Sequence, residues 1–107
     1  MTIDSNQLEQ MIDRILALSE TMLGHANGNV WSSVAEISIE REPLVQGLAK
    51  HLDGQKELDQ ALVSGLERIL EINQTLEALG QVELDRCAVE ARKVMKGRQG
   101  VNAYTGA

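Results

Sequence analysis

The chain has 107 residues, carries a formal net charge of −6 and contains no phenylalanine. This length is typical of one domain, and the acidic balance argues against nucleic acid as a partner, because phosphate binding calls for a basic face. Trp31 and Tyr104 are the only aromatic residues, so the core must be assembled from aliphatic side chains. Such cores suit packed helices better than β-sandwiches, and we expect an all-α protein.

The pattern predicts three helices in an antiparallel bundle or coiled coil, because short connections make consecutive helices antiparallel. The first helix spans about residues 5–27, and Gly28 is expected just past its end. Its apolar residues recur at helical spacings of three and four. They are Leu8, Met11, Ile12, Ile15, Leu18, Met22 and Ala26.

Asn29 is expected to cap a second helix over about residues 30–52. Pro43 lies inside this segment and removes one helical hydrogen bond. Two structures fit this pattern: a helix with a kink just before the proline, or two shorter helices with Pro43 at the start of the second.

A third helix is predicted over about residues 57–96, because this segment lacks proline and its glycines, Gly65 and Gly80, are isolated. An isolated glycine costs a helix only about 1 kcal/mol. We therefore predict one long continuous helix rather than a chain that turns back near Gly80 to close a four-helix bundle. The predicted domain comprises residues 1–97, and a short flexible tail, 98–107, follows it.

The last part of the third helix is predicted to project past the shorter helices and to bind a partner. Small residues dominate its apolar stripe, which leaves a shallow groove with room for another helix. The residues expected at this surface are Leu76, Leu79, Leu84, Cys87, Ala91, Val94 and Met95.

No residues show the spacing of a catalytic or metal site. His25 and His51 lie near helix ends and lack the Glu-x-x-His pairing of di-iron bundles, and neither HExxH nor CxxC occurs. Cys87 is interpreted as a small packing residue rather than a nucleophile. No glycine-rich loop is present to cradle a phosphate. We expect no enzyme activity, no metal and no cofactor.

The sequence also predicts a cytoplasmic protein without membrane insertion. No apolar run approaches the roughly 18 residues that a membrane span needs. The N-terminus lacks the positive charge and apolar block of a signal peptide. Cys87 is the only cysteine, which agrees with a reducing compartment.

Tyr104 lies in the predicted tail, where an aromatic ring contributes little to folding. Its chemistry leaves two interpretations open with equal weight. The ring either anchors the tail in a partner's pocket or has no role.

Taken together, these features resemble a FliT-type flagellar export chaperone. The resemblance rests on Trp31 at the start of the second helix, the run Glu40-Arg41-Glu42-Pro43-Leu44-Val45, the long third helix and the closing Asn102-Ala103-Tyr104. It implies a bacterial chaperone that keeps the flagellar filament-cap protein soluble and delivers it to the type III export apparatus. The export gate and the export ATPase are then further partners, and Tyr104 matches the tyrosine that engages the gate.

Two other functions fit the same helical pattern. One is the sister chaperone for the hook–filament junction proteins, which shares size and helicity. The other is a structural coiled-coil oligomer, in which the end of the third helix pairs with a second copy of the chain to form a homodimer.

Overall fold

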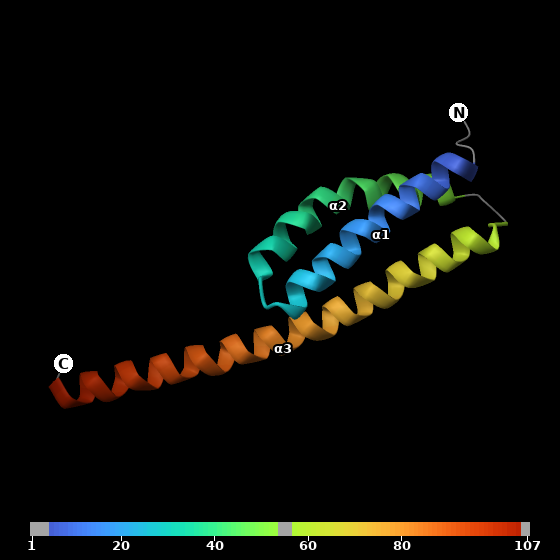
Figure 1. Cartoon of the computed structure of the whole chain (residues 1–107). Helices are drawn as coiled ribbons and strands as arrows, with labels where there is room; N and C mark the ends of the chain where they lie inside the picture. Colours follow the sequence, from blue (N-terminus) through green and yellow to red (C-terminus); the bar gives the residue numbers. More distant parts are fainter. Residues whose placement is uncertain (1–4, 54–56, 106–107) are drawn as a thin grey trace. The chain divides into compact units, whose positions relative to one another are not determined.

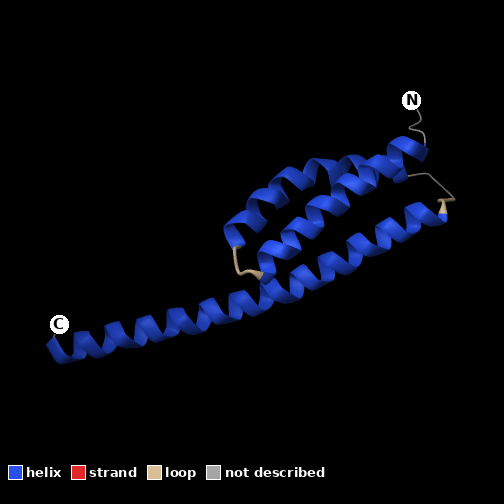
Figure 2. Cartoon of the chain, viewed as in Figure 1, coloured by secondary structure: helices blue, strands red, loops and turns tan. Residues whose placement is uncertain are grey.

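The computed structural model describes residues 5–53 and 57–105, and within them the side chains of residues 6–53 and 57–98. The described residues form three helices and no strand (Figures 1 and 2). The helices are α1 (Ser5–Asn27), α2 (Trp31–Leu52) and α3 (Gln60–Thr105). The predicted all-α fold with a long third helix is confirmed. The chain divides into two compact units, Met1–Glu77 and Ala78–Ala107, and α3 contributes to both.

The turn after α1 reverses the chain through a left-handed residue. Asn29 has a φ of 63°, and its amide donates to the carbonyl of Ala26 at 3.0 Å. The amide of Val30 donates to the carbonyl of His25 at 2.8 Å. This pair of bonds is the Schellman motif with Asn29 at its left-handed position. The prediction had placed Gly28 there, one residue too early.

Asn29 is therefore not the N-cap of α2, as the sequence had suggested. Val30 occupies that position and makes no side-chain capping bond. The side chain of Asn29 instead accepts a hydrogen bond from Trp31 Nε1 at 2.9 Å. In this turn the backbone of Asn29 ends α1 and its side chain binds the half-buried indole of Trp31. The side chain is therefore not available to cap α2.

Pro43 lies inside α2 without dividing it into two helices. Of the two alternatives that the sequence left open, the single helix is the one observed, and Figure 1 shows it as a curved ribbon. A proline removes one backbone hydrogen bond, and its ring clashes with the carbonyl four residues earlier. The helix therefore bends away from the face that carries the proline.

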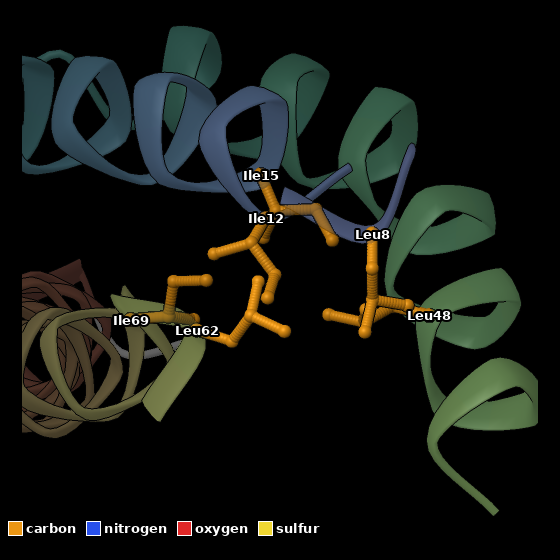
Figure 3. Packing of buried hydrophobic residues seen from close by; sticks show 6 residues of the cluster. All are labelled: Leu8, Ile12, Ile15, Leu48, Leu62 and Ile69. Carbon is orange, nitrogen blue, oxygen red and sulfur yellow. The ribbon is translucent and has the colours of Figure 1, made fainter. Parts of the chain in front are cut away.

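The core of the first unit joins all three helices through aliphatic side chains. Figure 3 shows the cluster of Leu8, Ile12, Ile15, Leu48, Leu62 and Ile69, contributed by α1, α2 and the first part of α3. Gly65 allows α3 to approach α1 closely, because a Cβ at this position would lie 2.6 Å from Cγ2 of Ile12. The missing side chain is therefore a packing requirement of this contact.

The ends of α3 differ from the prediction. The helix begins at Gln60 rather than at Glu57, and the carbonyl of Asp59 accepts the bond from the amide of Val63 at 3.0 Å. It runs without interruption through Gly80 and continues to Thr105. The expected end near residue 96 is thus too early, because a glycine inside a helix costs only about 1 kcal/mol and does not by itself stop it. The flexibility of residues 98–107 stays a prediction.

Candidate functional site

The part of α3 in the second unit exposes a series of large apolar side chains. Val82, Leu84, Val89, Val94 and Met95 are between 45% and 67% exposed. Among the side chains that the structure describes, none of the buried core residues lies beyond Ile72. Exposed apolar residues gathered on one element mark an interaction surface more often than a folding requirement.

Helical geometry divides these side chains between two faces. Leu84, Cys87, Ala91 and Val94 are separated by three, four and three residues, so they form one continuous stripe with Met95 beside it. We call these five residues the apolar stripe of α3. All five are exposed. All five were predicted to bind a partner from the sequence.

Val82 and Val89 lie on the opposite face of the same segment and were missed by the sequence reasoning. Val89 has only charged residues three and four positions away on either side, and Val82 has charged residues at those positions on its C-terminal side, so the search for spacings of three and four passed over them. Their separation of seven residues was the signal that could have found them, since residues seven apart share a face.

An ion pair stiffens the beginning of the stripe. Arg86 donates to both carboxylate oxygens of Glu83, from Nη2 at 2.7 Å and from Nε at 3.1 Å. The hydrogen bond from Arg86 holds the pKa of Glu83 below its usual range, and the same pair raises the pKa of Arg86. The thiol of Cys87 donates to Glu83 at 3.6 Å.

The first unit carries a second feature, a pocket of about 310 Å³ that sequence reasoning did not locate. Its lining residues are Met22, Arg41, Asn73, Leu76 and Glu77. Leu76, predicted to contact a partner, is half-buried at this pocket, and Leu79 is half-buried one turn further along α3. The remaining predicted residue, Tyr104, lies in the helical backbone of α3, and its side chain is outside the described set.

At the pocket, Arg41 of α2 forms hydrogen bonds with residues of both α1 and α3. Its Nη1 donates to Ser19 Oγ of α1 and to Asn73 Oδ1 of α3, both at 2.8 Å. Ser19 is fully buried and itself donates to the carbonyl of Ile15 at 2.7 Å. Burial lowers the pKa of Arg41, while the neighbouring charge of Glu42 acts in the opposite direction. The guanidinium stays charged, because arginine is not deprotonated in proteins.

Among the described residues, neither histidine belongs to a cluster of metal-ligating side chains. His25 is half-buried and His51 exposed, each near the end of its helix. Among the described residues, no three His, Cys, Asp or Glu side chains come together as metal ligands. No helix in the described ranges has both the length and the apolar character to span a membrane.

The described residues thus belong to an all-helical protein that carries an exposed apolar stripe on its third helix. The family model described as "Flagellar protein FliT" matches residues 9–106. Since this match covers most of the chain, the chain belongs to the FliT family of flagellar export chaperones, as the resemblance had indicated. This is a family of chaperones. Comparisons with curated proteins and with solved structures found no match.

Proposed function

We propose that this protein is a cytoplasmic chaperone for the flagellar filament-cap protein, which it holds on the apolar stripe of α3 and delivers to the type III export apparatus. The observation that carries the proposal is the exposure of the stripe: Leu84 is 66% exposed, and Val94 and Met95 are each 61% exposed. An amphipathic helix of the client that lies along this stripe removes its apolar area from water, which provides the binding free energy.

The small residues of the stripe set the geometry of that contact. Cys87 and Ala91 lie between Leu84 and Val94, so the centre of the stripe is lower than its ends. A client helix approaches closely at such small residues, while the larger side chains on either side pack against its flanks.

Delivery is assigned to the end of α3. Tyr104 lies in its last turn, after Lys96 and Arg98. A tyrosine presents a large rigid ring and a hydroxyl at low entropic cost, which suits insertion into a pocket of the export gate. The basic side chains steer this end towards an acidic surface, an attraction that added salt weakens.

The test is sedimentation of the protein with and without the purified cap protein. A chaperone shifts into a heterocomplex when the client is added. Leu84→Glu should abolish that shift, because it places a charge in the contact. Leu70→Glu is the matched control, since Leu70 lies on the same helix in the first unit and is 59% exposed.

The same experiment separates the proposal from a structural oligomer. A homodimer formed through α3 sediments at one size whether or not the cap protein is present, and Leu84→Glu then converts it into a monomer. That result would contradict the assignment of the stripe to a client.

A further inference from the structure

The pocket of the first unit is lined by a cation, Arg41, that forms no ion pair with the described side chains. The carboxylates on either side of Arg41 in the sequence form their hydrogen bonds with other residues, although the charge of Glu42 still acts on the guanidinium from nearby. Glu40 pairs with Arg14 at 3.1 Å, and Glu42 accepts a hydrogen bond from Gln46 at 3.2 Å. Among the described side chains, the ion pairs formed by arginine involve Arg14, Arg68 and Arg86, and none involves Arg41.

The donors of this guanidinium are only partly used. Arginine has five N–H groups. Nη1 donates to Ser19 and Asn73, which leaves the N–H groups of Nε and Nη2 without an acceptor within the described part of the chain. Two free N–H groups on one edge of a guanidinium match the two oxygens of a carboxylate.

The position of the guanidinium is already set before any ligand binds. Its two hydrogen bonds reach α1 and α3, and Ser19 is fully buried. A group that is held in place loses little entropy on binding, so more of the interaction energy appears as affinity. Partial burial also strengthens the attraction between this cation and an anion, because less water screens it.

Beside Arg41, Asn73 and Glu77, the pocket is lined by two apolar side chains, and it is small. Met22 is 4% exposed, and Leu76 is half-buried beside it. The volume of about 310 Å³ is at the lower limit of ligand pockets, which begin near roughly 300 Å³. This space suits one aliphatic side chain with a charged neighbour better than an extended cofactor.

We propose that this pocket binds an acidic side chain of a partner protein, with the carboxylate on Arg41 and an adjacent aliphatic side chain on Met22 and Leu76. The occupant is taken to be a protein segment because of the proposed chaperone function, and the proposal rests on that function to this extent. The site is separate in sequence from the apolar stripe of α3 and adds a charged contact to an otherwise apolar mode of binding.

Glu77 provides a test in which the proposal predicts the direction of the change in affinity. It lines the pocket and is exposed, so its negative charge opposes an incoming carboxylate. Removing that charge should strengthen binding of an acidic ligand and leave binding of a neutral one unchanged. A purely structural role of Arg41 predicts no gain in affinity for the acidic ligand.

The experiment titrates the whole protein with two blocked dipeptides, acetyl-Leu-Glu-amide and its neutral isostere acetyl-Leu-Gln-amide, and follows backbone amide resonances by NMR. We expect shifts at Ser19, Arg41, Asn73 and Glu77. The acidic peptide should bind about tenfold more tightly, a difference of about 1.4 kcal/mol, because its hydrogen bonds to the guanidinium are charge-assisted on both sides.

Two substitutions should then move the affinity in opposite directions. Glu77→Gln should raise the affinity for the acidic peptide about threefold, and Arg41→Lys should reduce the preference for it to within about twofold. Glu67→Gln removes the same charge from an exposed position of α3 outside the pocket and should change neither affinity.

Equal affinity of the wild-type protein for the two peptides would overturn the proposal, and so would an unchanged or lower affinity of the Glu77→Gln protein for the acidic peptide. Because Glu77 is exposed, its replacement tests the site even if Arg41→Lys perturbs folding. The titration needs no client. A failure here is therefore distinct from a failure of the chaperone function, which sedimentation with the cap protein measures.

Discussion

Replacing Gly65 by alanine should destabilise the protein, although alanine is the better helix former. The substitution gains about 1 kcal/mol of helix propensity. The new Cβ would lie 2.6 Å from Cγ2 of Ile12, whereas carbon atoms pack at about 3.5–4.0 Å. Ile12 is 2% exposed, and its branch at Cβ leaves the methyl group little freedom to move. Overpacking of this kind costs up to about 3 kcal/mol, so we expect a net loss of about 1–2 kcal/mol.

The assay is urea unfolding followed by far-ultraviolet circular dichroism. Gly24→Ala is the matched control, because Gly24 lies within α1 and a Cβ there meets nothing within 4 Å. It should stabilise the protein by up to about 1 kcal/mol. Ile12→Leu removes the Cγ2 branch, so combining it with Gly65→Ala should recover part of the loss and give a favourable coupling energy. If Gly65→Ala stabilises the protein as much as Gly24→Ala does, the close contact between α1 and α3 is not as described.

Three further outcomes follow from the geometry. Leu84→Glu and Leu70→Glu should each leave the free energy of unfolding within about 0.5 kcal/mol of the wild-type value, because both positions are exposed. A large drop in the melting temperature of the Leu84→Glu protein would instead place Leu84 in a core. Tyr104→Ala should leave client binding intact while reducing binding to the export gate, measured separately by titration calorimetry, and an equal loss of both would refute its role as an anchor. Arg41→Met should lower the free energy of unfolding by about 1–3 kcal/mol, because Ser19 and Asn73 each lose a charged hydrogen-bond donor. An unchanged midpoint of urea unfolding would show that these hydrogen bonds make no net contribution to stability.

Helical periodicity was sufficient to predict the elements of this protein. Residues such as Leu8, Ile12 and Ile15 recur at spacings that only a helix places on one face, and all three are buried as expected. The absence of proline between Glu57 and Lys96 likewise predicted that the third helix passes through Gly80. Local signals near single residues were less reliable. Gly28 and Asn29 are both acceptable at a helix end, and the hydrogen bonds of the turn decide which one takes the left-handed position.

The sequence by itself determined which residues are apolar, how they are spaced along each helix and therefore which face of each helix is able to pack. It could not determine where two faces meet, because that depends on contacts between residues far apart in the chain. The approach of Gly65 to Ile12 and the joining of Arg41 to Ser19 and Asn73 arise only when the three helices come together. Periodicity is a property of one segment, whereas a pocket belongs to several segments at once, so only the tertiary structure decided that Arg41 lies beside Met22 and Leu76.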